Sequence, residues 1–227
     1  MGFKGKRGQI YILMGLVLVT LLTVTLLTSS RTSHPSPENI ADVQMVLYQE
    51  GEGAVLRSLA YASNQTDVSV TFSQRLRQAL LKVEGSHFGI SLSPLVSQAS
   101  KSDGIVSAQG EVQFGWERGD VSRKLVYQVE LEQKVTKVEV FSGLSPQLVY
   151  IQLRVDLTLK KSQLPSPAVW RNSKIVYSSG EVACSLVKNF GNGTYLLGAS
   201  LLAGETTIDL VTFDSNNIQV ASRVVLP

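Results

Sequence analysis

The sequence predicts an α+β protein with a single N-terminal transmembrane helix, a helical segment plus a β-meander, and a C-terminal β-sandwich. Three patterns support this fold class. An apolar run occupies residues 10–28, apolar residues at helical spacing follow over residues 38–83, and a period of two begins near residue 104. Periods of 3.6 and 2 are typical of amphipathic helices and half-buried strands, respectively.

The apolar run has the length and composition of a membrane-spanning helix. The eighteen residues from Ile10 to Leu27 contain no charge, proline or amide side chain, and twelve of them are Leu, Ile or Val. As a helix they would extend roughly 27 Å, close to the hydrocarbon thickness of a bilayer. Insertion of the Leu, Ile and Val side chains contributes about −4 to −7 kcal/mol. Because the run lacks the polar face of a core helix, we predict a transmembrane helix over residues 10–28.

The charges beside this run predict its orientation. Lys4, Lys6 and Arg7 precede it without an accompanying acid, whereas the first cation beyond it is Arg31. Basic residues next to a membrane helix favour the cytoplasmic side. We therefore expect residues 1–9 in the cytoplasm and the C-terminal bulk outside, in a single-pass plasma-membrane protein.

The net charge gives no support to nucleic-acid binding. The chain has 21 basic and 18 acidic residues, a formal net charge of +3 and a pI near 9.0. Removing the three topogenic cations leaves 18 basic against 18 acidic residues. A neutral external part has no general attraction for phosphates. The expected partners are therefore the lipid bilayer, through residues 10–28, and other envelope or pilin-like subunits.

The sequence leaves three fates open for the hydrophobic segment. A cleaved secretory signal has an apolar region of about 7 to 15 residues followed by small residues. The run here is longer, which favours retention as a signal anchor, although Thr28-Ser29-Ser30 offers small residues for cleavage and secretion. The third fate is the assembly stem of a filament.

A short motif bears on this third fate. Lys6-Arg7-Gly8-Gln9 stands immediately before the apolar run and resembles the class III signal peptide of archaeal type IV pilins and related surface proteins. The resemblance implies cleavage on the cytoplasmic side between Gly8 and Gln9, with the hydrophobic helix retained. It covers about 25 of the 227 residues.

Two features depart from that family pattern. Many such pilins carry glutamate at the fifth mature position, where this chain has Leu13. Pilin stems also continue as one long helix, whereas Pro35 and Pro37 lie within residues 29–37 here and disfavour helix before them. We therefore expect a juxtamembrane linker at residues 29–37 and a single-span surface protein rather than a major pilin, with pilin-like processing left open.

Residues 38–145 are expected to form an α+β region. A helix is predicted to begin near Pro37-Glu38, and Gly51-Glu52-Gly53 leaves open whether it divides into two. A second helix is predicted with Gly85 as its C′ residue. The apolar positions that predict the helices are Ile40, Val43, Val46, Leu47, Val55, Leu56, Leu59 and Ala60 for the first, and Phe72, Leu76, Ala79, Leu80 and Val83 for the second.

Alternation then predicts a hairpin. Its strands are joined by a turn at Arg118-Gly119-Asp120 that is longer than two residues. The apolar phase slips between Leu131 and Val138, so we expect a bulge or a strand break there. The alternating residues are Val106, Ala108, Val112, Phe114 and Trp116 before the turn, and Leu125, Tyr127, Val129 and Leu131 after it.

Residues 146–227 are predicted to form a β-sandwich domain of immunoglobulin-like type. Five or six short strands are separated by turn signals every ten or so residues, including Gly191-Asn192-Gly193 and Ser215-Asn216-Asn217. Leu164-Pro165-Ser166-Pro167 is predicted as a turn or edge segment. No Cys–Trp–Cys pattern is present, so the prediction concerns architecture only. The alternating sets are Val149 to Leu159, Val182 to Leu186, Tyr195 to Leu201, Ile208 and Leu210 (or Val211 and Phe213), and Ile218, Val220 and Val224.

The sequence offers no catalytic constellation. Cys184, the sole cysteine, lies in an alternating apolar pattern and is predicted to be a buried, inert thiol. His34 and His87 are the only histidines, and no G-x-S-x-G elbow accompanies them. Glu130, Glu132 and Glu139 lie among lysines and are predicted to form a solvated, charge-paired face. We therefore expect no enzyme activity, no metal and no cofactor.

Two sequons are candidates for N-glycosylation. Asn64-Gln65-Thr66 is expected at a helix end, and Asn192-Gly193-Thr194 in a hairpin turn.

The leading functional hypothesis is a non-enzymatic, membrane-anchored surface protein that is structural, adhesive or a minor pilin-like component. The main alternative is an extracytoplasmic ligand-binding module, for example for glycans, which exposed Trp116, Trp170 or Tyr177 would support. An envelope hydrolase would instead need two or three convergent acids in a deep cleft.

Overall fold

The computed structural model describes residues 37–86, 90–116, 119–143 and 145–227. Two helices open this part of the chain, α2 (Pro37–Ser63) and α3 (Val68–Ser86). Asp67 caps α3, because its Oδ1 accepts the backbone N–H of Val70 at 3.1 Å. Neither of these two described helices is long and apolar enough to span a bilayer. The predicted membrane helix over residues 10–28 and most of the linker at 29–37 lie outside the described residues.

The first helix is continuous through Gly51-Glu52-Gly53, so the open question of its division is answered. From Leu47 onward it buries an apolar stripe of Leu47, Ala54, Val55 and Leu59. Tertiary burial of this kind outweighs the weak helix propensity of two glycines. Pro37 is the first helical residue, as predicted.

The second helix has the predicted buried face of Phe72, Leu76, Leu80 and Val83. Gly85 does not act as a C′ residue, because α3 continues to Ser86 and Gly85 has no positive φ. The end of the helix is instead stabilised by Ser86, whose hydroxyl donates to the carbonyl of Val83 at 2.7 Å.

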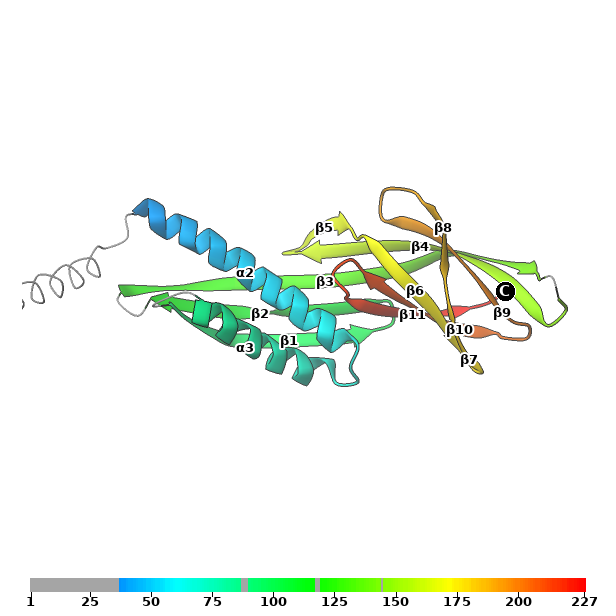
Figure 1. Ribbon diagram of the computed structural model, residues 1–227, viewed down its shortest axis with the longest axis horizontal. Coiled ribbons are helices and arrows are strands. Elements are labelled where there is room, and N and C mark those ends of the chain that lie inside the picture. The colour runs from blue at the N-terminus through cyan, green and yellow to red at the C-terminus, as the bar shows by residue number, and fades with distance from the viewer. Residues whose placement is uncertain (1–36, 87–89, 117–118, 144) are drawn as a thin grey trace, which may run out of the picture. The chain divides into compact units, whose positions relative to one another are not determined.

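Most of the remaining described residues belong to two antiparallel sheets (Figure 1), an arrangement compatible with a β-sandwich. The first sheet has the order β1-β2-β3-β4-β9-β8, and β5 pairs with β4 beyond the end of β9. Its strands are β1 (Ile90–Ser102), β2 (Ile105–Trp116), β3 (Gly119–Ser142), β4 (Leu148–Lys161), β5 (Leu164–Pro167), β8 (Ser185–Asn189) and β9 (Thr194–Leu202).

The second sheet has the order β11-β10-β6-β7. Its strands are β6 (Trp170–Tyr177), β7 (Gly180–Ala183), β10 (Thr207–Asp214) and β11 (Gln219–Val225). Two of the predicted turns close hairpins. The β10–β11 turn of the second sheet contains Asn217 with φ 65°, and the β8–β9 turn of the first sheet contains Gly191 and Gly193 with φ 82° and 84°. Asparagine and glycine tolerate this left-handed region best.

The helices and the second sheet cover the same face of the first sheet. Residues two apart along β3 share one face. Tyr127 on that face meets Phe72 of α3 with ring centroids 6.5 Å apart. Gln133, six residues further on the same face, donates from Nε2 to the carbonyl of Leu210 at 3.0 Å and to Ser222 Oγ at 2.8 Å. The opposite face, called the outer face below, is not covered by any described element.

The predicted irregularity between Leu131 and Val138 is confirmed. The register of β3 against β4 shifts between Val135 and Lys137, and the strand remains continuous as a bulge. The extra residue restores the apolar phase, so Leu131 and Val138 both lie on the face that pairs with the buried side of β4.

Three other expectations need correction. β1 was not predicted, because its sequence ISLSPLVSQASKS is rich in serine and a register shift at Pro94/Val96 interrupts the alternation. The connection between β2 and β3 is shorter than predicted, since Gly119 already pairs with Trp116. Cys184 does not lie within a strand: it separates β7 in one sheet from β8 in the other.

The boundary predicted at residues 145 and 146 lies inside the first sheet. β3 ends before it and β4 begins after it, yet the two strands pair along thirteen residue positions. Residues 47–227 form one compact unit.

Candidate functional site

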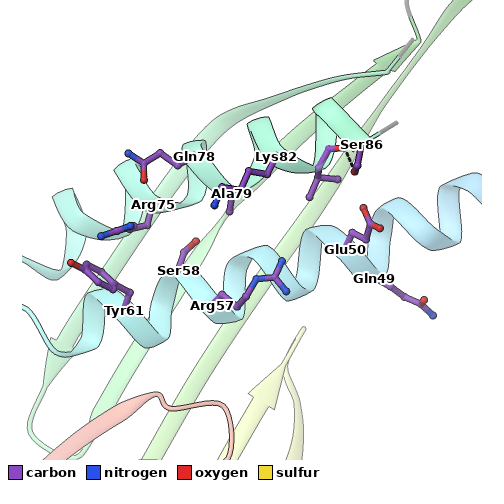
Figure 2. Close-up of a pocket in the computed structure, with 11 residues that line it drawn as sticks. Gln49, Glu50, Arg57, Ser58, Tyr61, Arg75, Gln78, Ala79, Lys82 and Ser86 are labelled. Carbon is purple, nitrogen blue, oxygen red and sulfur yellow. Dashed lines mark hydrogen bonds between the residues drawn. The ribbon is translucent and has the colours of Figure 1, made fainter. Parts of the chain in front are cut away.

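A groove of about 640 Å³ lies between α2 and α3 (Figure 2). Its walls are the sides of the two helices that face each other, and the buried Ser58 and Val83 contribute to its lining. We call it the interhelical groove. Its lining residues are Gln49, Glu50, Arg57, Ser58 and Tyr61 from α2, and Arg75, Gln78, Ala79, Lys82, Val83 and Ser86 from α3.

The interhelical groove is cationic. Arg57 extends from α2, and Arg75 and Lys82 extend from α3, two turns apart. Among the described residues, none of these three cations has a carboxylate oxygen within 4.0 Å. Glu50 is the single acid in the lining. The local charge is therefore +2, in a chain whose residues 8–227 are formally neutral.

Arg75 is held in a defined position. Its guanidinium carbon lies 3.8 Å from the ring centroid of Tyr61 on the facing helix, a cation–π geometry. Stacking uses the flat face of the guanidinium and leaves its in-plane N–H groups free to donate. Tyr61 itself remains 46% exposed. This pair therefore fixes a multi-donor cation at one end of the groove.

The other polar groups of the groove differ in whether they can still form hydrogen bonds with a ligand. The Ser58 hydroxyl donates to the carbonyl of Ala54 at 2.7 Å, so its proton is used within α2. Gln49 and Gln78 are exposed, and their amides can both donate and accept. The groove can therefore bind a ligand that combines negative charges with hydroxyl groups.

A second, smaller cavity of about 200 Å³ lies between α2 and β3, and its walls are mainly apolar. Tyr127 is one of its lining residues; its hydroxyl is buried without a hydrogen-bond partner among the described residues, and burial raises its pKa. Gly110 lies directly against it: a Cβ at Gly110 would lie 2.6 Å from the Tyr127 oxygen. We interpret this cavity as a packing defect beside a close contact rather than as a site.

The outer face has an apolar end and an open edge. The side chain of Tyr150 on β4 lies against Gly198 on the neighbouring strand β9. The ring centroids of Phe141 and Tyr150 are 6.2 Å apart. Strand β8 forms the edge, with all five residues exposed, and Val187 contacts the same glycine. We call the following set the apolar patch; each member is between 40% and 44% exposed: Phe141, Leu148, Val187 and Leu202.

The other end of the outer face is polar, which confirms the predicted charge-paired face. Lys160 Nζ lies 2.7 Å from Glu130 and 2.9 Å from Glu132, and hydrogen bonds to these two carboxylates raise the pKa of Lys160 to about 12. Glu139 pairs with Lys137 closer to the apolar end, two residues from Phe141 on the same face. These acids are therefore bound to lysines and do not converge in a cleft.

Cys184 is half-buried at the point where the chain passes between the sheets. Burial raises the pKa of its thiol to about 12. At neutral pH the thiolate, which is the reactive form, is scarce. The predicted inertness thus has a physical basis, although the residue lies outside any strand.

The two sequons occupy different surroundings. Asn64 is exposed directly after α2 and donates from Nδ2 to the carbonyl of Ala60 at 3.1 Å. Asn192 lies in the β8–β9 turn as predicted, but the hydroxyl of its sequon residue Thr194 is buried and donates to Asp156 at 2.7 Å. Glycosylation of either asparagine stays a prediction.

Several residues singled out in the sequence lie outside the described part. They are Lys4, Lys6, Arg7, Gly8, Gln9, His34 and His87, together with the side chain of Trp116. Trp170 is not a free platform, because its Nε1 donates to Ser173 at 2.8 Å and its ring packs against Tyr195. Over the described ranges, no three His, Cys, Asp or Glu side chains gather where they could hold a metal ion.

Sequence reasoning missed the interhelical groove. Arg75, Gln78 and Lys82 were recognisable as the polar side of a helix, but nothing in the sequence placed Arg57 opposite them. Comparison of the chain with protein-family models, curated proteins and solved structures gives no match.

Proposed function

We propose that this protein is a non-enzymatic, membrane-anchored surface protein, structural, adhesive or minor pilin-like, whose external part makes contacts through the outer face of its first sheet. The anchor in this proposal is the apolar run over residues 10–28, oriented by Lys4, Lys6 and Arg7. Processing between Gly8 and Gln9 belongs to the same proposal.

The observation that carries the contact function is the apolar patch beside an unpaired edge strand. Exposed apolar side chains that gather on one face of a protein often mark an interaction site. Strand β8 adds unpaired backbone groups along the same edge. An edge with apolar side chains can accept a strand of another protein by β-augmentation.

The immunoglobulin-like type of the sandwich is part of this proposal. Its support is the repeated passage of the chain between the two sheets, after β5, at Cys184 and after β9. Sandwiches of this type present edges and end loops as contact surfaces.

Site-specific photo-cross-linking tests the contact function. Val187 is replaced by benzoylphenylalanine in the apolar patch, and Gln109 is replaced in the same way as a matched control, because it is exposed on the polar end of the same face. After irradiation of intact cells we expect a discrete adduct from position 187 and none from position 109. No adduct at 187, or the same adduct at both positions, would contradict the proposal.

One observation favours a second candidate function, an extracytoplasmic ligand-binding module. It is the cationic interhelical groove, which is separate from the outer face. This alternative applies equally to an anchored protein and to one that is secreted after signal-peptide cleavage.

A further inference from the structure

We propose that the interhelical groove binds an acidic oligosaccharide, a sugar chain that carries carboxylate groups. This inference rests on the second candidate function and deepens it by naming the ligand class. It depends neither on the membrane anchor nor on the apolar patch.

The first argument is charge. Arg57, Arg75 and Lys82 line one groove and have no carboxylate partner among the described residues. Elsewhere in the same compact unit, Lys124, Lys137, Lys160, Lys161, Lys174 and Arg223 each pair with an acid. Other described cations, such as Arg77, Arg154 and Lys188, also have no ion pair, so what distinguishes the groove is that three unpaired cations line one hollow. An anion from outside the chain would complete their pairing.

The second argument is spacing. Arg75 and Lys82 are seven residues apart on α3, a separation of roughly 10 Å along the helix axis. Arg75 is held against Tyr61 at one end of the groove, and Arg57 extends from the opposite wall. A ligand with at least two negative groups along an extended chain can therefore pair with more of these cations than a single small anion can.

The third argument distinguishes carboxylated sugar from a phosphate chain. The cations alternate with neutral polar groups, of which the exposed amides of Gln49 and Gln78 can bind hydroxyls. The local charge is only +2, whereas nucleic-acid sites depend on dense, extended positive charge.

Binding of a defined ligand tests the inference. The full chain is purified in a neutral detergent that contains no sugar, and isothermal titration calorimetry measures its affinity for oligogalacturonate of six residues. The uncharged sugar cellohexaose and a single-stranded oligonucleotide of similar charge are titrated in parallel. We expect saturable binding of the uronate that weakens with salt, no binding of cellohexaose, and at least tenfold weaker binding of the oligonucleotide.

Variants assign the binding to the groove. Arg57→Gln, Arg75→Gln and Lys82→Gln are each expected to weaken binding about tenfold, and the triple variant about 100-fold or more. Arg77→Gln is the matched control, because Arg77 is exposed on the same helix but does not line the groove. All four side chains are exposed, so folding is expected to be retained and is checked by circular dichroism.

Three results would overturn the inference. They are no uronate binding, equal affinity for the oligonucleotide, and equal loss of affinity in Arg77→Gln and the groove variants. None of them affects the cross-linking result at Val187, so the failure of this inference and of the contact function are distinguishable.

Discussion

Replacement of Gly104 by alanine is expected to lower the free energy of unfolding by about 3 kcal/mol. Gly104 forms the turn between β1 and β2 with φ 71°. An added Cβ would lie 2.7 Å from the backbone oxygen of Gln133, in the middle of the first sheet, and 3.3 Å from Ser222 Oγ. Neither β3, which carries Gln133, nor β11, which carries Ser222, can move away without losing backbone hydrogen bonds to its neighbouring strand.

The turn at Gly104 also joins the two sheets. Its N–H donates to Ala221 on β11 at 2.7 Å, and its carbonyl accepts the N–H of Gln133 on β3 at 2.7 Å. The adjacent Asp103 accepts the N–H of Arg223 at 2.7 Å. A displaced turn would therefore weaken the contact between the first sheet and β11 as well as the hairpin itself.

Gly191→Ala separates the two causes of the stability loss expected for Gly104→Ala, which are the positive φ and the close contact with Gln133. Gly191 has φ 82°, but nothing lies within 4 Å of its added Cβ, so only the conformational cost of about 1 kcal/mol applies. Urea unfolding of the full chain in detergent, followed by tryptophan fluorescence, measures both variants. If Gly104→Ala loses no more stability than Gly191→Ala, the close contact with Gln133 is not a constraint on the fold.

Replacement of Asp214 by alanine is expected to cost about 3 kcal/mol of unfolding free energy. Asp214 is 0% exposed and closes the β10–β11 turn. Its Oδ1 accepts the N–H groups of Asn216 at 2.9 Å and Ile218 at 2.8 Å, and its Oδ2 accepts the Asn216 amide at 2.8 Å. Alanine leaves these donors without a partner in a buried turn.

The control for this variant is Asp209→Ala on the same strand. Asp209 pairs with Arg223 at the surface, with their side chains 44% and 70% exposed. Exposed pairs contribute at most about 1 kcal/mol, so Asp209→Ala should change stability far less. Equal losses in the two variants would contradict the role given to Asp214.

Asp214→Asn is expected to have a distinct pH dependence. Burial raises the pKa of Asp214 above its usual value of 3.8 and outweighs the hydrogen bonds that lower it. The folded state therefore favours the protonated form, and this contribution to stability is lost as pH rises from 3.8 through the raised pKa. Asparagine does not titrate, so the stability of Asp214→Asn relative to the native chain should increase between pH 3.5 and 7. A constant difference over this range would contradict the raised pKa.

Much of the fold could be predicted from local patterns. The helical stripes of α2 and α3 and the alternation in β2, β3, β4 and β9 are strong because each element buries one face. The bulge in β3 was predictable for the same reason: the pattern changes phase within a strand, and only an extra residue keeps both halves facing the core.

The remainder depends on information that local patterns do not carry. β1 buries few residues, so serine and Pro94 hide its alternation. Val182 and Leu186 alternate around Cys184, yet the chain changes sheets there, which depends on partners far away in sequence. The interhelical groove requires the side-by-side placement of two helices, which only tertiary packing provides.

Protease treatment of intact cells tests the central claim, export of the C-terminal bulk behind a retained apolar stem. Proteinase K is added to cells whose envelope admits it, and peptides are quantified by mass spectrometry, with a cytosolic protein as the integrity control and lysed cells as the digestion control. The account predicts that peptides from residues 38–227 disappear while a membrane-bound fragment containing the apolar run survives. Full-length chain in the soluble cytosol, or a C-terminal bulk that is digested only after lysis, would contradict it.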